Sequence, residues 1–501
     1  MSDEAVLIGG AASPSRLLLR YANRHGLVAG ATGTGKTITV QGLAEGFSAA
    51  GVPVIVADVK GDLSGIAMPG SPSERIGKRW EQIGLPVPPF AGAPVRIWDV
   101  LGEGGVALRL SISELGPQML ARMMELNETQ ETVLALVFRF ADDEGLLLLD
   151  LADLGTTLAH LAENAKDMGP RYAAFSRPSV AAIQRRLLLL EEGGGLRFFG
   201  EPAVTLGDFL QTAPDGRGMV NLLDARKLVS QPRLYSSFLL WLLSELYETL
   251  PEAGDADKPK MAFFFDEAHL LFADAPKSLR ERVEQVVRLI RSRGVGIYFI
   301  SQSPGDIPDT VLAQLGNRIQ HALRAYTPAE QKAVRVAADA FRANPAFDTR
   351  TVIGELAVGE ALVSTLDAGG VPTVVERVLI RPPSSRMGPL SEPERAELLR
   401  SDVLHARYRE AHDPVSAHEV LSQRAADAVN RSAREEAPQI RFPREEPQAR
   451  VPREDSPRPA PRGRQRESAG EALVKSVARA VGSSLGRSIV RGVLGSILRG
   501  R

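Results

Sequence analysis

Residues 30–37 read Gly30-Ala31-Thr32-Gly33-Thr34-Gly35-Lys36-Thr37 and match the pattern G-x-x-x-x-G-K-[ST]. The run HGLVAG before this stretch predicts a strand, and the apolar spacing from Ile38 to Ala50 predicts a helix after it. Glycines let the backbone approach an anion closely, while the loop N–H groups and the amino end of the helix point toward it. The stretch therefore predicts a P-loop that binds a nucleoside triphosphate.

The chemistry of this loop predicts ATP and Mg²⁺ as its ligands. Lys36 supplies a mobile cation to the β- and γ-phosphates, and the Thr37 hydroxyl is an expected magnesium ligand. We expect the nucleotide to contact Gly30, Ala31, Thr32, Gly33, Thr34, Gly35, Lys36, Thr37 and Ile38. The alternative is a glycine-rich turn that merely precedes a helix. The full pattern between a strand and a helix disfavours that alternative.

A second predicted strand follows the helix. The run VPVIVAD, residues 52–58, is rich in β-branched residues and predicts a strand buried on both faces. A strand, a helix and a strand within about 35 residues form a βαβ unit, which implies parallel strands. The predicted fold class is therefore α/β with a mostly parallel central sheet.

Two carboxylates end a further predicted strand. Ala262–Phe265 is apolar, and Asp266, Glu267 and His269 follow it. Parallel sheets place their ligands at the carboxyl ends of strands. We therefore expect Asp266 to hold Mg²⁺ through its water shell and Glu267 to polarise the attacking water as a general base. Carboxylates also commonly start helices, which is the alternative interpretation of this pair. His269 fits either the water network or a helix face without a role.

Strand and helix patterns divide the rest of the chain into segments. Residues 1–390 are expected to form the main domain, with further strands in MAFFFD, VGIYFIS, RIQHALRA, EALVSTL and TVVERVLI. Residues 71–260 have mostly helical spacing and predict an insertion between the second strand and MAFFFD, with a separate domain as the alternative. Residues 391–432 predict a helical extension. Residues 433–468 are rich in Arg, Pro and Glu and too poor in apolar residues to fold alone, which predicts a disordered linker.

The last segment, residues 469–501, alternates apolar and basic positions at helical spacing and contains several glycines. From residue 441 to the end there are 14 Lys and Arg against 6 Asp and Glu, which leaves residues 1–440 with a net charge of −9. Three interpretations are open: a helix that packs on other helices, an amphipathic element on a membrane surface, and a basic arm on nucleic acid. The absence of aromatic anchors disfavours the membrane, and we favour packing or self-association.

Bulk composition excludes several classes of protein. The net charge of −1 does not by itself point to a nucleic-acid or membrane partner, so any such contact must come from a local patch. The absence of cysteine excludes disulfides and thiol chemistry. Seven histidines include no H-E-x-x-H or H-x-x-E-H spacing, so a metalloprotease is excluded. The first residues lack a basic, apolar signal pattern, and no stretch reaches the roughly 18 apolar residues of a spanning helix. We therefore expect a cytoplasmic protein.

Several stretches together resemble one family. They are the P-loop, DVKGDLSG (58–65), FFFDEAHLLF (263–272), RSRGVGIYFISQSPGDIPDTVLAQLGNRIQHALRAYTP (291–328) and GEALVSTL (359–366). They resemble the short bacterial HerA-like ATPases, relatives of the HerA and FtsK translocases. The resemblance covers about residues 5–390 and the glycine-rich segment 482–496, and it implies a RecA-like fold and assembly as a ring-shaped hexamer. HerA has a β-barrel ahead of its P-loop, for which residues 1–29 leave no room, so ATPase activity is implied more directly than processive helicase activity.

The resemblance also implies roles for three further side chains. Gln302 matches a polar sensor of the γ-phosphate, Arg291 matches an arginine that reaches the nucleotide of the adjacent subunit, and Arg318 is similar to a second arginine near the subunit boundary. A cation placed across a boundary stabilises charge in phosphoryl transfer. The alternative for each arginine is a surface salt bridge. Asp58 and Asp62 of the DVKGD stretch are plausible near the site because a second parallel strand ends there, but we favour a loop in which Lys60 and Asp62 make local contacts.

Three functions are consistent with these features. The first is a ring-forming, ATP-driven motor on DNA, which the family resemblance favours. The second is an ATPase that remodels or moves a protein partner, which the net charge of −9 over residues 1–440 favours because a DNA channel usually needs basic walls. The third is a nucleotide-dependent scaffold without turnover, against which Glu267 argues.

Overall fold

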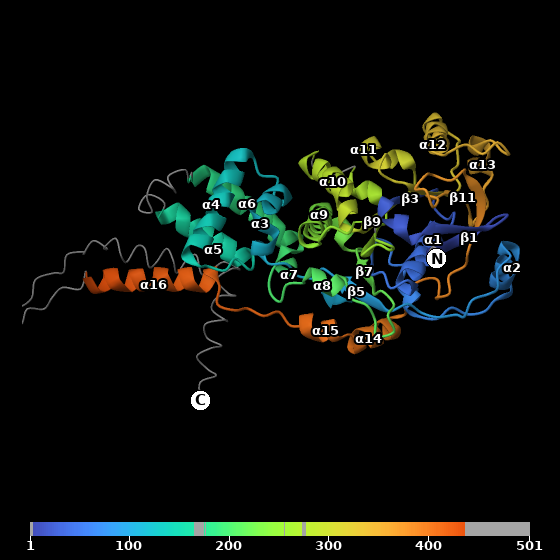
Figure 1. Ribbon diagram of the computed structural model, residues 1–501. Coiled ribbons are helices and arrows are strands. Elements are labelled where there is room, and N and C mark those ends of the chain that lie inside the picture. The colour runs from blue at the N-terminus through green and yellow to red at the C-terminus, as the bar shows by residue number, and fades with distance from the viewer. Residues whose placement is uncertain (1–3, 165–174, 176, 255, 273–276, 436–501) are drawn as a thin grey trace, which may run out of the picture. The chain divides into compact units, whose positions relative to one another are not determined.

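The computed structural model describes residues 4–164, 175, 177–254, 256–272 and 277–435, and they are organised around one twelve-stranded sheet (Figure 1). Eight neighbouring strands run parallel in the order β10-β3-β9-β8-β4-β7-β5-β6. Strands β11, β12, β1 and β2 continue the sheet beyond β10 in antiparallel pairs. The strands are β1 (Ala5–Gly10), β2 (Pro14–Leu18), β3 (Gly26–Ala29), β4 (Val54–Asp58), β5 (Val95–Asp99), β6 (Val106–Ala107), β7 (Val220–Asp224), β8 (Met261–Phe265), β9 (Val295–Ser301), β10 (Asn317–Gln320), β11 (Glu360–Ser364) and β12 (Glu376–Ile380). The predicted α/β class with a mostly parallel sheet is confirmed.

Helices connect the strands, and local caps fix where several of them begin. Asn127 and Ser111 form capping boxes with Gln130 and Glu114 at the starts of α4 and α3. The helices are α1 (Lys36–Ala49), α2 (Glu74–Ile83), α3 (Ile112–Met123), α4 (Glu128–Glu144), α5 (Leu151–Asn164), α6 (Arg177–Leu190), α7 (Leu196–Phe198), α8 (Leu206–Phe209), α9 (Pro232–Thr249), α10 (Lys277–Ile290), α11 (Asp309–Leu312), α12 (Pro328–Asp339), α13 (Thr349–Glu355), α14 (Glu392–Ser401), α15 (Val403–Tyr408) and α16 (Ala417–Glu435). Short turns η2 (Ser64–Ala67), η6 (Ala268–Leu271) and η7 (Arg291–Arg293) matter for the site below.

Apolar side chains cover both faces of the parallel sheet. Along β8, Phe264 packs on Phe47 of α1 and Tyr298 of β9, while Phe263 and Phe265 point to the opposite face. All three β8 phenylalanines are fully buried. Since successive strand residues face opposite sides, only an apolar run can occupy a strand covered on both faces. The same holds for β4, as its sequence predicted.

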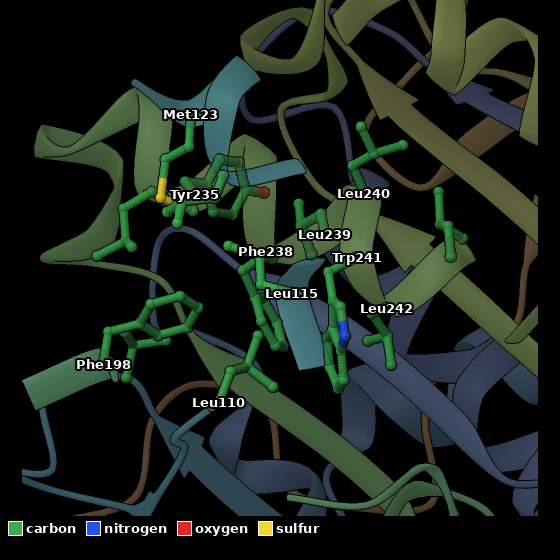
Figure 2. Close-up of a cluster of buried hydrophobic side chains, with 14 of the residues drawn as sticks. Leu110, Leu115, Met123, Phe198, Tyr235, Phe238, Leu239, Leu240, Trp241 and Leu242 are labelled. Atoms are coloured by element: carbon green, nitrogen blue, oxygen red, sulfur yellow. The ribbon is translucent and has the colours of Figure 1, made fainter. Parts of the chain in front are cut away.

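The face opposite α1 is covered mainly by α9 and its neighbours. Figure 2 shows α9 side chains, among them Phe238 and Trp241, in one cluster with Leu115 of α3, Leu110 and Phe198. The large rings of this cluster are almost completely removed from water. This packing places α9 against η6, directly after the end of β8.

One predicted boundary is wrong. Residues 71–260 are not a single insertion between β4 and β8, because β5, β6 and β7 from this range belong to the central sheet. Strand β7 pairs directly with β4, with Asn221 opposite Ile55. The helices of the range are real, and α3, α4, α5 and α6 pack on one another between β6 and β7. These strands escaped notice because they lack the β-branched run of β4 and the chemically specific residues that follow β3 and β8.

Helices also follow residue 390, as predicted. α16 packs along α5 (Figure 1), and the His418 ring nitrogen Nδ1 lies 2.7 Å from Thr156 Oγ1 at this contact. α16 continues to Glu435, so residues 433–435 of the predicted linker are helical. The rest of that linker and the predicted basic helix, residues 469–501, lie outside the described residues. None of the helices in the described part of the chain combines the length and apolar character needed to cross a bilayer.

Candidate active site

The register of four parallel strands brings distant segments to one edge of the sheet. Ala29 at the end of β3 lies opposite Ser301 of β9, Phe299 of β9 lies opposite Phe265 of β8, and Phe265 lies opposite Ala57 of β4. The segments that follow these residues are the P-loop, Gln302, the Asp266–Glu267 pair and the loop that carries Lys60. They therefore leave the sheet side by side, as ligand sites of α/β folds do.

The P-loop backbone is shaped to hold an anion. Gly33 and Gly35 have φ values of 78° and 111°, which residues with a side chain rarely adopt. Gly35 is the N-cap of α1 and no side chain caps that end, so the first N–H groups of the helix have no side-chain acceptor. The loop is fixed to its neighbours by hydrogen bonds from Gly30 N to Ser301 O (3.2 Å) and from Ala31 N to Ala322 O (2.9 Å). A triphosphate fits this cradle of backbone donors.

Lys36 is buried beneath the loop. Its Nζ donates to Gly30 O at 2.5 Å and to Ala31 O at 3.2 Å, both neutral acceptors. Burial lowers the pKa of Lys36, and the nearby charge of Lys60 lowers it further, against the opposing effect of the carboxylates nearby. A polyanion that contacted Nζ would satisfy this buried cation.

Asp266 and Glu267 turn out of the sheet at the end of β8. Glu267 has φ 47° and ψ 51°, in the left-handed region that few non-glycine residues occupy. Burial raises the pKa of Asp266 to about 6, although the charge of Lys60 opposes that shift. Burial would also raise the pKa of Glu267, but a hydrogen bond and the charge of Lys60 outweigh it and lower the pKa below its usual value.

The Glu267 carboxylate is contacted from three segments. Lys60 Nζ lies 2.7 Å from Oε1, Gln302 Nε2 donates to Oε2 at 3.4 Å, and His269 Nδ1 lies 3.3 Å from Oε2. The structure therefore brings the predicted sensor Gln302 to the predicted base. It also places His269 beside that base rather than on an isolated helix face.

Oxygen ligands for a divalent cation lie close to the P-loop. Thr37 Oγ1 donates to Asp62 Oδ2 at 3.3 Å, and the charges of Asp62 and Asp266 repel each other. A hard cation takes hydroxyl and carboxylate oxygens, so these residues fit Mg²⁺. In the part of the chain that the structure describes, no three His, Asp or Glu side chains gather to hold a metal alone. Magnesium here would depend on phosphate and water oxygens for its remaining ligands.

The two predicted arginines do not join this site within one chain. Exposed Arg291 lies in η7, before β9 begins, and so at the sheet edge opposite the P-loop. Arg318 is half-buried and donates to Leu315 O at 3.2 Å and to Leu312 O at 3.1 Å. These contacts give Arg318 a structural role at the end of α11. Action of either arginine on a neighbouring subunit stays a prediction.

Sequence reasoning did not assign three residues to the site. It considered Asp62 near the site but favoured local contacts for Asp62 and Lys60, yet they contact Thr37 and Glu267 from the loop after β4. His321 is buried behind the P-loop, where its Nε2 lies 2.9 Å from Thr39 Oγ1. Each residue follows a strand that is parallel to β3, and this position was the one sequence feature that could have indicated a place near the P-loop. Which of these strands are neighbours in the sheet was not readable from the sequence.

The match to a known family covers almost the whole chain. The family described as Helicase HerA-like C-terminal matches residues 7–501. The chain belongs to this HerA-like family. The resemblance inferred from the motifs is thereby confirmed, and the sheet that carries the P-loop after β3 is the P-loop ATPase fold expected of it.

Individual proteins similar to this HerA-like chain are more distant. It is 27% identical over 154 residues to Probable helicase MJECL08 of Methanocaldococcus jannaschii, and the aligned part is 29% of this chain and only 28% of that protein. The conjugative coupling protein TrwB, solved unbound and with ADP and Mg²⁺, is 14% identical over 76% of this chain and 92% of its own, with a TM-score of 0.49. VirB4 of Thermoanaerobacter pseudethanolicus is 16% identical over 76% and 97%, with a TM-score of 0.47. No residue role is transferred from these structures.

Proposed function

We propose that this HerA-like chain hydrolyses ATP in a magnesium-dependent reaction at the edge formed by β3, β9, β8 and β4. The observation that carries the proposal is the convergence of Lys36, Glu267 and Gln302 on one site. Lys36 would bind the β- and γ-phosphates, and Thr37 and Asp266 would hold the magnesium ion. That ion would neutralise phosphate charge when bound.

The reaction needs one water molecule and one base. The water oxygen attacks the γ-phosphorus, the bond from that phosphorus to the bridging oxygen breaks, and ADP and phosphate leave. Glu267 accepts the proton of the water, and Gln302 keeps the carboxylate in place through its 3.4 Å contact. Neither residue needs to form a covalent intermediate, which agrees with how phosphoryl transfer is usually catalysed.

We further propose that the chain assembles as a ring, most simply a hexamer, and moves along DNA. The family description and the printed name of the Methanocaldococcus jannaschii relative both contain the word helicase. Arg291 lies at the sheet edge opposite the P-loop, so any part that it takes in hydrolysis would be at the site of another subunit. The net charge of −9 over residues 1–440 supports the second candidate, an ATPase that moves a protein partner.

Phosphate release by the full chain tests both parts. Lys36→Ala should reduce turnover to background, whereas Lys78→Ala should not, because Lys78 is exposed and pairs with Glu74 of its own helix α2. Turnover that survives Lys36→Ala would reject the site. Single- and double-stranded DNA should each be added to the wild-type chain. Stimulation supports the DNA motor, and equal rates with and without DNA support the protein-directed alternative.

A further inference from the structure

The Glu267 carboxylate is held by a cation from a different strand end. Lys60 Nζ lies 2.7 Å from Oε1, whereas the contacts on Oε2 come from Gln302 and His269 at 3.4 and 3.3 Å. The Glu267 side chain is only 9% exposed. Since both oxygens are contacted from separate segments, rotation of the carboxylate would break an ion pair in a poorly solvated place.

The loop that carries Lys60 is itself fixed. The buried Asp58 carboxylate accepts hydrogen bonds from Gly61 N at 2.7 Å and from Leu63 N at 3.2 Å, on the far side of Lys60. Gly61 has φ 73°, and a Cβ there would lie 2.4 Å from Arg226 Cδ. These contacts restrict the backbone from which the Lys60 side chain extends. A long, flexible side chain positions its partner well only from such a base.

The charge of Lys60 also affects its neighbours in the site. It acts on Lys36, Asp266 and Glu267, and Nζ contacts Glu267 directly. The Lys60 side chain remains 39% exposed. It occupies the side of Glu267 that faces the neighbouring strand β4.

We propose that Lys60 is a positioning residue that orients the Glu267 carboxylate toward the attacking water. The proposal rests on the ATPase function proposed above. A catalytic base must be held within a fraction of an ångström of its working geometry, and one ion pair from an independent strand achieves this without contacting the substrate. Lys60 therefore acts through Glu267 and affects turnover more than nucleotide binding.

The first test separates turnover from binding. Lys60→Met should lower kcat by about tenfold or more while KM for ATP and the affinity for a fluorescent ATP analogue change less than about twofold. Lys60→Arg should restore most of the lost rate because it keeps the charge. An unchanged or increased kcat in Lys60→Met would overturn the proposal, as would a loss confined to KM. Thermal unfolding of each variant identifies a misfolded one, and Lys60→Gln then replaces Lys60→Met.

The second test asks whether Lys60 acts through Glu267. Single-turnover hydrolysis of radiolabelled ATP should be measured for Lys60→Met, Glu267→Gln and the double variant. The double variant should be no slower than Glu267→Gln alone, because nothing is left to position. Equal fold losses in both backgrounds would show that Lys60 acts elsewhere. If the wild type itself shows no turnover above Lys36→Ala, the proposed function fails. If the wild type hydrolyses ATP and Lys60→Met does so at the same rate, only this inference is rejected.

Discussion

Gln302 Nε2 donates to Glu267 Oε2 at 3.4 Å and so links the ends of β9 and β8. The contact is long for a hydrogen bond, and it joins the residue that directly follows β9 to the second residue after β8. Gln302→Ala should lower kcat about tenfold while ATP binding persists, because the phosphate cradle is untouched. Steady-state phosphate release together with analogue binding measures both quantities.

The matched control for this variant is Gln314→Ala, since Gln314 is exposed after α11. We expect its kcat to equal that of the wild type. Gln302→Glu adds a second test, because a carboxylate beside Glu267 repels it and removes the donor. If Gln302→Glu turned over as fast as the wild type, the contact would have no part in catalysis.

Gly35, the N-cap of α1, has a backbone conformation that residues with a side chain rarely adopt. At φ 111° an added Cβ is strained, and it would also lie 3.3 Å from Gly359 N. Gly35→Ala should weaken ATP binding about tenfold or more, since a strain of about 1–2 kcal/mol falls on the loop that must hold the phosphates. Gly77→Ala on α2 is the control, because nothing lies within 4 Å of its Cβ position. That change should leave binding alone and stabilise the helix slightly.

A buried ion pair fixes α1 to the end of β12. Arg381 Nη1 lies 3.0 Å from Glu45 Oε2, and the two side chains are 9% and 10% exposed. Arg381→Met should destabilise the fold by about 3 kcal/mol in urea unfolding, because it leaves Glu45 charged without its cation. Arg350→Met removes a pair whose side chains are 53% and 57% exposed and should cost at most about 1 kcal/mol. Equal losses of unfolding free energy in the two variants would mean that burial does not increase the cost of breaking this ion pair.

The strands that are followed by candidate catalytic residues could be predicted from the sequence, and local patterns explain why. The P-loop and the run before Asp266 each combine an apolar run with chemically specific residues, so β3, β8 and the residues after them were identified. Short strands β5 and β7 lack such a signature and lie among long helices. Their membership of the sheet depends on tertiary pairing, which periodicity does not encode.

Contacts between residues on neighbouring strands could not be predicted from the sequence for a similar reason. Lys60 lies more than 200 residues from Glu267, and their contact follows from β4 pairing with β8. In any other strand order, Lys60 would make only the contacts within its own loop that its sequence context predicted. Arg318 shows the reverse: its family position favoured a boundary role, while the structure shows contacts with two carbonyls of its own chain.

His25 predicts a measurable pH dependence of stability. Its ring is fully buried, with Nδ1 accepting from Ile297 N at 3.0 Å and Nε2 2.9 Å from Val287 O. Burial lowers its pKa from 6.5 to about 4. The unfolded chain therefore binds the proton first, and stability is lost as the pH falls from about 6.5 to about 4. From pH 7 to pH 5 this contribution is about 2 kcal/mol.

The measurement is a difference between two proteins. Asp58 and Asp266 have raised pKa values, about 7 and about 6, and change stability in the opposite direction over an overlapping range. Both carboxylates are present in the wild type and in His25→Asn, so their contributions drop out of the difference between the two proteins. Asn tolerates the φ of 56° at this position. Urea unfolding should show a smaller loss from pH 7 to pH 5 in His25→Asn than in the wild type. Parallel curves would reject the assignment.

Mixing experiments decide whether Arg291 serves a neighbouring subunit. Arg291→Ala keeps its own P-loop, and Lys36→Ala keeps its own arginine, since the two lie at opposite edges of the sheet. Each variant alone should be inactive, and a mixture should recover part of the wild-type rate wherever an intact P-loop meets an intact arginine. Arg288→Ala, exposed one turn earlier on α10, should stay active and is the control. Inactive mixtures that still co-assemble, shown by light scattering, would reject the action of Arg291 on the neighbouring subunit.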